Sequence, residues 1–196
     1  MSGTTWFVTG FLAVAFVERV TQSCTAQTTD RGELKMVWSL YAMYVSYTII
    51  MAGSAVEACW LRPGLHVGWS VLGLALYLAS VLLRKVSIRT LGRFWSLQVE
   101  IRAEHRLIRE GPYRYVRHPI YTAIVMEVVA IPLAVNAWFT LIFACLVHVP
   151  LVLLRMRFEE QALVEKLGDE YRRYQQEVGA LFPRIPASGP HSGVIS

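Results

Sequence analysis

Long apolar runs, almost free of charged residues, divide the first 154 residues of the chain. The runs cover residues 4–17, 36–56, 65–83 and 120–154. About 20 apolar residues cross the hydrocarbon core of a bilayer, so the second and third runs each have the length of one span. The last run has 35 residues, too many for one span, and Asn136 offers a place to turn. The pattern predicts an all-α integral membrane protein whose last two spans form a hairpin.

About five transmembrane helices follow from these runs, with the short first run included. The polar residues before that run lack the basic start of a signal peptide, which favours a span. After residue 183 the chain is rich in Pro, Gly and Ser, which indicates a flexible tail over 184–196. We therefore predict one membrane domain over 1–183. Its expected spans lie near 4–20, 36–58, 65–83, 120–135 and 137–154.

The composition agrees with a membrane location. Hydrophobic residues make up 55% of the chain and charged residues 17%, which excludes an ordinary soluble domain. Aromatic residues make up 12%, more than a disordered chain would carry. The three cysteines have no paired spacing, so a disulfide-stapled secreted module is excluded as well.

Basic residues are distributed very unequally between the two predicted faces. Residues 18–35 hold three, residues 84–119 hold nine and the chain from Arg155 onward holds six, whereas the other face holds only Arg62. Positively charged loops remain on the cytoplasmic side of a membrane. We therefore expect the N-terminus outside and the C-terminus and active site in the cytoplasm. The net charge of +5 is then explained without a nucleic-acid partner.

The basic cytoplasmic segments have regular patterns of their own. Residues 96–102 alternate apolar and polar, which predicts a short strand or extended segment. Beyond Arg155, apolar residues recur at the spacing of one helical face, and Gly168-Asp169 predicts a break in that helix. We expect C-terminal helices that pack two tyrosines against the core. The residues on this face are Val164, Leu167, Tyr171, Tyr174 and Val178.

Two segments that flank the final hairpin carry the informative motifs. The first, H-R-L-I-R-E-G-P-Y-R-Y-V-R-H-P-I-Y, covers residues 105–121; the second, R-x-x-x-E-E-x-x-L-x-x-x-x-G-x-x-Y-x-x-Y, begins at Arg155. Together they resemble the isoprenylcysteine carboxyl methyltransferase family, integral-membrane enzymes that use S-adenosylmethionine. The resemblance covers roughly residues 98–183. Phospholipid N-methyltransferases, thiol S-methyltransferases and NADPH-dependent sterol reductases share parts of it.

The resemblance implies roles for particular residues. Arg155 matches the family arginine that meets the substrate, and Glu159 matches a cofactor-binding glutamate; we expect both to act in catalysis. Ile108 replaces the usual valine of the first motif, a mild change. The implied residues for S-adenosylmethionine are Gln98, His105, Arg106, Leu107, Ile108, Tyr113, His118, Pro119, Ile120, Tyr121 and Glu159.

The residue types suit this cofactor. A carboxylate and tyrosine rings can meet a cationic sulfonium, and a cation over a ring contributes roughly 0.5 to 2 kcal/mol. Arg155 and Glu159 are four residues apart, so they share one helical face. A carboxylate acceptor is already ionised at neutral pH and needs no general base. An amine or thiol acceptor would need one, and His105, His118 and Glu160 are the candidates.

Alternative interpretations remain open for several residues. Arg114 and Arg117 suit lipid-headgroup anchors, and Glu57 suits an interfacial position. Glu127 and His148 would either hydrogen-bond between spans or line a substrate path.

Two other function classes remain. The first is an NADPH-dependent reductase, in which Asn usually replaces Ile120; the second is a non-catalytic membrane protein. We favour methyl transfer from S-adenosylmethionine to a lipophilic small molecule or prenylated substrate, with carboxyl O-methylation preferred over amine or thiol methylation and with membrane lipids as surroundings. We expect no metal and no obligate protein partner.

Overall fold

The computed structural model describes residues 3–25, 37–61, 65–92 and 107–184, and in these ranges the chain is almost entirely helical. Parallel pairing is limited there to one isolated bridge between Val116 and Gly179. The prediction of an all-α fold is confirmed. The elements are α1 (Gly3–Thr25), α2 (Val37–Val56), the π-helical turn η1 (Glu57–Leu61), α3 (Val67–Leu91), the 3-10 turn η3 (Gly111–Arg114), α4 (Pro119–Ala134), α5 (Trp138–Phe143), the π-helical turn η4 (Ala144–His148), α6 (Val149–Leu167) and α7 (Asp169–Glu177).

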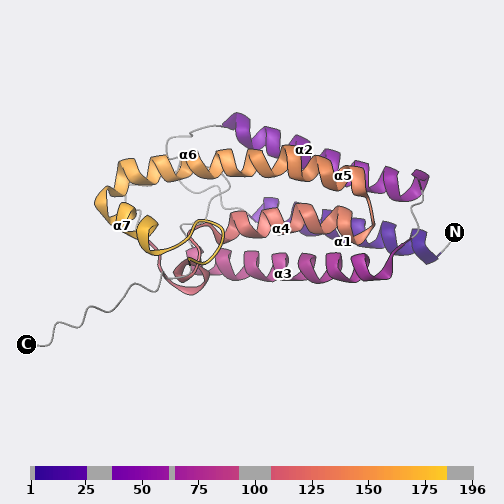
Figure 1. The fold of residues 1–196 in the computed structure, drawn as a ribbon, viewed down its shortest axis with the longest axis horizontal. Helices are drawn as coiled ribbons and strands as arrows, with labels where there is room; N and C mark the ends of the chain where they lie inside the picture. The colour runs from indigo at the N-terminus through magenta and orange to yellow at the C-terminus, as the bar shows by residue number, and fades with distance from the viewer. Residues whose placement is uncertain (1–2, 26–36, 62–64, 93–106, 185–196) are drawn as a thin grey trace, which may run out of the picture.

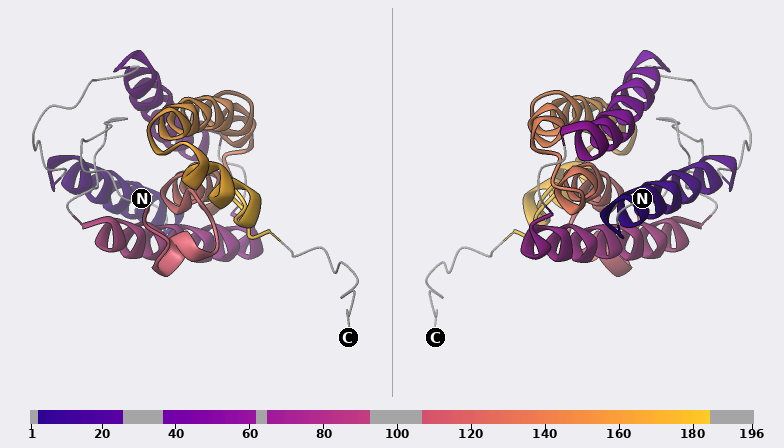
Figure 2. Two further views of the ribbon diagram at one scale, coloured as in Figure 1. Left: turned by 90° about the vertical axis from the view of Figure 1, so that its left-hand side faces the viewer. Right: turned by 90° about the vertical axis from the view of Figure 1, so that its right-hand side faces the viewer.

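The long helices lie roughly alongside one another in the view of Figure 1, and Figure 2 shows that α1 and α3 are inclined to the direction of α6. The segments α5, η4 and α6 follow one another as one continuous helix, and α4 lies between this helix and α3 (Figures 1 and 2). The N-terminus and the turn between α4 and α5 lie at one end of the bundle. The other end, which we call the motif end, holds η3, the start of α4 and α7 (Figure 1).

Within the part of the chain that the structure describes, three helices are long and apolar enough to cross a membrane: Trp38–Trp60, Val67–Leu91 and Trp138–Leu167. The apolar helix Pro119–Ala134 is shorter. Helix α1 spans 23 residues and carries Glu18 and Arg19 near its end. An integral membrane protein is therefore supported, while the number of five spans stays a prediction.

Helix α4 packs closely against α3 along its length. Val128, Ala130 and Ile131 of α4 are fully buried in the main apolar cluster, with Tyr77 of α3 beside them. Gly73 makes the approach possible, because a Cβ at this position would collide with the backbone of Ala134. The start of α4, which carries H-P-x-Y, is thereby held on a rigid element.

Asn136 forms the turn of the final hairpin, as predicted. Its backbone adopts φ 60°, the left-handed region that asparagine tolerates better than most residues. The buried side chain donates to Ser70 Oγ (2.9 Å) and accepts from His66 N (3.1 Å). Asn136 therefore also ties the hairpin to the start of α3.

Two charged residues near the predicted span ends are buried. Helix α3 continues to Leu91, beyond the predicted end of the span at residue 83, so Arg84 is not a loop residue but is buried within the helix. Only 6% of Glu57 is exposed, and it accepts bonds from Phe139 N and Thr140 N at 3.0 Å each; its interfacial position stays a prediction. Its carboxylate thus satisfies the free amides at the start of α5.

The predicted C-terminal helices are confirmed. Helix α6 ends at Leu167, Gly168 adopts φ 55°, and α7 begins at Asp169. Tyr171 and Tyr174 of α7 are buried, as their spacing predicted. Glycine suits the break because it enters the left-handed region without the steric penalty of a Cβ. The predicted tail 184–196 lies outside the described residues except for Arg184.

Candidate active site at the motif end

The R-H-P-x-Y motif forms the junction between η3 and α4. Pro119 is the first residue of α4, where its missing N–H leaves no helical bond unmade. Tyr113 of η3 is buried, and its carbonyl accepts a hydrogen bond from Tyr174 Oη at 2.5 Å. Helix α7 therefore fixes the segment that precedes the motif.

Tyr121 and Glu159 meet across the final hairpin. Tyr121 Oη in the first turn of α4 donates to Glu159 Oε2 of α6 at 2.6 Å. Tyr121 is buried, and its ring lies 5.6 Å from the ring of His118, between centroids. The structure thus brings together three residues that the resemblance assigned to one cofactor.

Arg155 lies one helical turn before Glu159 and is 4% exposed. Its Nη1 donates to Ser39 Oγ of α2 at 2.8 Å. Val152 and Met156, its neighbours on α6, form a buried apolar cluster with Tyr121. Arg155 therefore places a fixed positive charge beside an apolar surface, an arrangement that suits an anionic group on a lipophilic molecule.

Glu160 is the centre of a second set of contacts. Its Oε1 accepts from Arg117 Nε and Nη2 at 2.9 and 2.7 Å and lies 3.0 Å from His118 Nε2. Gln175 Nε2 of α7 donates to its other oxygen at 3.3 Å. The prediction of Arg117 as a headgroup anchor is wrong, because its side chain is only 10% exposed and is engaged by Glu160. Arg114 is exposed, as an anchor would be.

The buried tyrosines at this end remain neutral. Burial, reinforced by the nearby Glu159 carboxylate, raises the pKa of Tyr113 far above its ordinary value. Burial also raises the pKa of Tyr174 to about 12 and that of Tyr171 well above the usual range. At neutral pH these hydroxyls therefore keep their protons, and that of Tyr174 is donated to the Tyr113 carbonyl.

The structure describes most of the predicted site and leaves part of it outside. Gln98, His105 and Arg106 lie outside the described residues, as does the predicted extended segment 96–102. The remaining implied residues occur at the motif end, but their roles stay predictions. These described residues are Leu107, Ile108, Tyr113, His118, Pro119, Ile120, Tyr121, Arg155 and Glu159.

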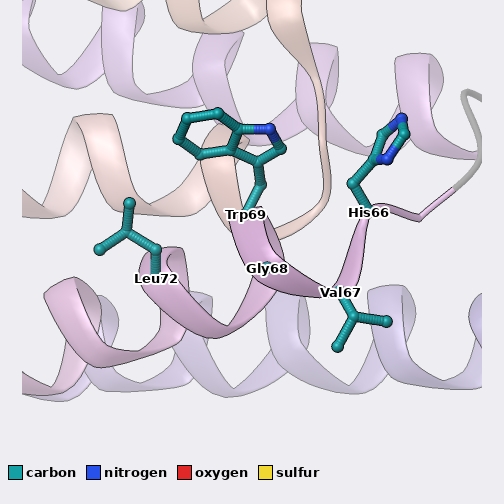
Figure 3. Close-up of a pocket in the computed structure, with 5 residues that line it drawn as sticks. All are labelled: His66, Val67, Gly68, Trp69 and Leu72. Atoms are coloured by element: carbon teal, nitrogen blue, oxygen red, sulfur yellow. The ribbon is translucent and has the colours of Figure 1, made fainter.

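An open pocket occurs at the opposite end of the bundle, at the start of α3 (Figure 3). His66, Val67, Gly68, Trp69 and Leu72 line it. None of these residues belongs to either motif, so this pocket does not mark the candidate site. In the described ranges no group of His, Cys, Asp and Glu could hold a metal ion.

Sequence analysis missed several residues that complete the motif end. Ser39 and Gln175 contact Arg155 and Glu160, and the carbonyls of Gly179 and Ala180 accept the amides of Arg117 and His118 at 2.8 and 3.0 Å. Backbone carbonyls leave no signature in a sequence. The adjacent Glu159 and Glu160 were a usable signal, since two such residues on a helix must face different partners.

Glu127 lies at the centre of a separate ionic cluster deeper in the bundle. It is 0% exposed and accepts from Arg19 Nη2 of α1 (2.7 Å), from Arg84 Nη1 of α3 and from Tyr47 Oη of α2 (3.0 Å). Arg84 Nη2 also donates to Glu18 at 2.9 Å. We call Glu18, Arg19, Arg84 and Glu127 the ionic core. Its contacts agree with the interspan alternative for Glu127.

His148 also bonds between spans. Its Nδ1 lies 2.8 Å from Ser46 Oγ of α2. This contact and the Arg155–Ser39 bond both join α2 to the helix made by η4 and α6. His148, like Glu127, therefore has the interspan bond that one of the two interpretations predicted.

Comparison with known proteins places this geometry in a family. The isoprenylcysteine carboxyl methyltransferase family matches residues 71–165, which include most of α3, the first motif, the hairpin and the start of the second motif. A probable protein-S-isoprenylcysteine O-methyltransferase of Oryza sativa subsp. indica is 30% identical over 129 residues, covering 64% of this chain and 68% of the relative. The chain belongs to the isoprenylcysteine carboxyl methyltransferase family. The expected enzyme class, a membrane methyltransferase, is thereby confirmed.

Other relatives define the range of this similarity. Protein-S-isoprenylcysteine O-methyltransferase B of Arabidopsis thaliana is 29% identical over 183 residues, covering 89% of this chain and 91% of the relative. Methanethiol S-methyltransferase 1 of Bradyrhizobium diazoefficiens is 35% identical over 71 residues, or 36% of this chain and 24% of the relative.

A solved structure shares the fold. The eukaryotic intramembrane Ras methyltransferase of this family superposes with a TM-score of 0.52 at 23% identity. The match covers 76% of this chain and 50% of that one, so the chain spans half the length of the solved protein.

Proposed function

We propose that this protein transfers a methyl group from S-adenosylmethionine to a carboxylate of a lipophilic acceptor at the cytoplasmic membrane face. The observation that carries the proposal is the arrangement of Arg155 and the Tyr121–Glu159 pair on adjoining faces of α4 and α6. A buried cation then lies beside an apolar cluster, one helical turn from a carboxylate that can bind a cationic donor. The protein-S-isoprenylcysteine O-methyltransferase relatives support the same acceptor class.

The described residues fit the proposed cofactor. S-adenosylmethionine supplies an electrophilic methyl group on a cationic sulfonium. Glu159, oriented by the Tyr121 hydroxyl, offers a negative charge for the hydroxyl or cationic parts of that molecule. The buried rings of Tyr113 and Tyr121 offer faces against which an adenosine or a sulfonium packs. We infer that these residues bind and orient the donor.

Arg155 would hold the acceptor. Its planar guanidinium can donate two parallel bonds to a carboxylate, which fixes both the position and the direction of the attacking oxygen. Transfer of the methyl group from the sulfonium to the carboxylate oxygen would give a neutral ester and release a neutral thioether, so both opposite charges would disappear. Such a reaction needs alignment and exclusion of water more than proton transfer.

The contacts of the candidate bases favour a carboxylate over an amine or thiol. Among the described residues, the candidates are His118 and Glu160, and they contact each other at 3.0 Å. This contact occupies His118 Nε2, so an acceptor that must lose a proton would have only Nδ1 of that ring to receive it. An ionised carboxylate would need no base.

The location of the site follows the basic residues. Of the 19 Lys and Arg residues, 18 belong to segments that a five-span arrangement puts on one side. The motif end would then face the cytoplasm, and the N-terminus would lie outside.

A transfer assay tests the proposed reaction. Purified protein in detergent is incubated with S-adenosylmethionine labelled in its methyl group and with N-acetyl-S-farnesylcysteine as acceptor probe. We expect a labelled product that mild base hydrolyses, as it does a methyl ester. Label that resists base would overturn carboxyl methylation, and wild-type protein that binds NADPH but not S-adenosylmethionine would overturn methyl transfer itself.

Two matched variants test the donor site by calorimetry. Glu159→Ala should abolish measurable binding of S-adenosylmethionine. Glu170→Gln, in the first turn of α7 and exposed, should bind it like the wild type. Equal binding by wild type and Glu159→Ala would exclude Glu159 from the donor site.

The pH dependence separates carboxylate from thiol acceptors. Thiol methylation is the second candidate because of the stretch shared with methanethiol S-methyltransferase 1. A carboxylate acceptor predicts a rate that is flat from about pH 6 to 8, since its pKa lies near 4. A rate that rises through this range would favour a thiol that must be deprotonated.

A further inference from the structure

The residues that follow α7 run back across the R-H-P-x-Y motif. We call residues 178–181 the C-terminal strap. Arg117 N and His118 N donate to the carbonyls of Gly179 and Ala180 at 2.8 and 3.0 Å, and Thr122 Oγ1 donates to the carbonyl of Leu181 at 3.0 Å. Three successive strap carbonyls are therefore bound by a segment some 60 residues away in sequence.

Glu160 holds the strap and the motif together. Its carboxylate accepts hydrogen bonds from Arg117 Nε and Nη2. The third nitrogen of this guanidinium, Nη1, donates to the carbonyls of Gln175 (3.0 Å) and Val178. The arginine thus bridges the carboxylate and the chain that enters the strap. Charge-assisted bonds of this kind are about twice as strong as neutral ones. Gln175 also donates to the second oxygen of Glu160, so the orientation as well as the position of this carboxylate is fixed.

The strap side chains reach the apolar surface near Arg155. Ala180 and Leu181 pack against the cluster of Tyr121, Val152 and Met156. Both are half-buried, and Phe182 beyond them is exposed. Val152 and Met156 flank Arg155 on α6, so the strap adds apolar surface beside the proposed carboxylate-binding cation.

We infer that the strap is one wall of the binding site for the hydrocarbon part of the acceptor, and that Glu160 is the positioning residue that holds this wall in place. The inference rests on the proposed function, because Arg155 defines where the acceptor lies. Glu160 touches neither donor nor acceptor in this arrangement. Its neighbour Glu159 would contact the donor. The two adjacent glutamates would then have different roles: Glu160 orients the strap and Glu159 binds the cofactor.

Three variants test the wall in different ways. Glu160→Gln keeps the shape of the side chain and removes its charge. Gly179→Ala leaves Glu160 intact and distorts the strap, because a Cβ there would collide with the carbonyl of Phe182. Leu181→Ala leaves Glu160 and Gly179 intact and shortens an apolar side chain that forms part of the wall. Glu170→Gln on the exposed face of α7 is the matched control.

Kinetics with two probes give the expected result. With N-acetyl-S-farnesylcysteine, Glu160→Gln and Gly179→Ala should raise KM about tenfold, as expected when bonds to a charged group weaken. Both should leave kcat within about threefold and should raise the Kd of S-adenosylmethionine much less than they raise KM. Leu181→Ala should shift the ratio of kcat/KM between the farnesyl and the shorter geranyl probe by about fivefold. An unchanged ratio, or equal losses in donor and acceptor binding, would overturn the wall assignment.

Hydrogen exchange tests the positioning role of Glu160 without a methyl-transfer assay. Peptides covering 116–122 and 175–184 should exchange faster in Glu160→Gln than in wild type or Glu170→Gln, because the amides of Arg117 and His118 lose their fixed partners. Unchanged exchange would overturn the positioning role, whether or not a probe is methylated. A wild-type protein that methylates no probe would instead overturn the proposed function, and the exchange result would still decide the role of Glu160.

Discussion

Two carboxylates, the partly buried Glu160 and the fully buried Glu127, are both held by arginine but in different surroundings. Glu160 lies at the motif end, and its arginine also binds main-chain carbonyls. Glu127 lies inside the bundle, where Arg19, Arg84 and Tyr47 reach it from three other helices. The same chemistry therefore orients a short segment at one place and joins whole helices at the other.

The difference follows from the solvent around each carboxylate. An unpaired charge among membrane-spanning helices has no water to solvate it, so the ionic core balances two carboxylates against two arginines. At the motif end polar backbone is available, and Arg117 uses it. Breaking the contacts of Glu127 should hence destabilise the whole bundle, whereas breaking those of Glu160 should loosen only the segment that Arg117 holds.

The largest expected effect is on stability. Glu127→Leu leaves Arg19 and Arg84 without their shared carboxylate and should lower the free energy of unfolding by about 3–5 kcal/mol, the usual consequence of breaking a buried pair. Thermal unfolding in detergent measures this, with the isosteric Glu127→Gln expected to lose less. A Glu127→Leu variant as stable as wild type would show that the arginines need no carboxylate, and would remove the distinction between the two regions.

Arg155→Lys should affect catalysis and leave stability nearly unchanged. Lysine keeps the charge but cannot form the bidentate contact with a carboxylate. We expect kcat/KM for the farnesylated probe to fall ~10- to 100-fold, equivalent to one lost charge-assisted contact. Melting temperature is measured on the same sample. A large loss of stability with full activity would make Arg155 a structural tie to Ser39 only.

Tyr121→Phe should have a smaller effect on donor binding. The change removes the 2.6 Å bond to Glu159 and keeps the ring. We expect the Kd of S-adenosylmethionine to rise roughly 3- to 10-fold, because a hydrogen bond to a charged group is lost. Calorimetry gives this value, and an unchanged Kd would separate Tyr121 from the donor site.

Ser46→Ala probes a neutral interspan contact. It removes the partner of His148 Nδ1 and should lower the free energy of unfolding by about 1 kcal/mol, well below the loss expected for Glu127→Leu. Denaturation in detergent measures the difference. An effect as large as that of Glu127→Leu would mean that neutral and ionic ties between helices contribute equally.

Glu177→Gln should change almost nothing. Its ion pair with Arg109 spans 2.6 Å, but the two side chains are 56% and 41% exposed, so water and salt screen it. Stability should change by less than about 0.5 kcal/mol and activity should not change. Loss of activity here would show that α7 positions residues 107–110 more strongly than the Glu160 contacts suggest.

The sequence predicted many local features of the fold correctly. The apolar runs, the turn at Asn136 and the break at Gly168 each depend on neighbouring residues or on the membrane as solvent, so a local pattern is enough to reveal them. The partners of charged residues were not predicted. Helix α3 extends past the apolar run to Leu91, and Arg84 within it contacts carboxylates inside the bundle that no local pattern indicates.

The candidate site divides in the same way. The motifs identified which residues belong together, since their types and spacing match one chemistry. They did not indicate that Arg117 is engaged by Glu160 rather than by lipid, or that Ser39 contacts Arg155. Those pairs are separated by 43 and 116 residues, and only packing of the helices decides them.

By itself, the sequence determined that the chain needs a bilayer and that it is helical, and it indicated two motifs as the candidate site. Hydrophobic length and residue type are properties of short segments, and they act before any tertiary contact forms. The tertiary structure decided which charges pair, which carbonyls the strap offers to the motif, and that Glu159 and Glu160 face different partners. A charge or a backbone group inside a folded bundle must find its partner in three dimensions, because leaving it unpaired there costs several kcal/mol.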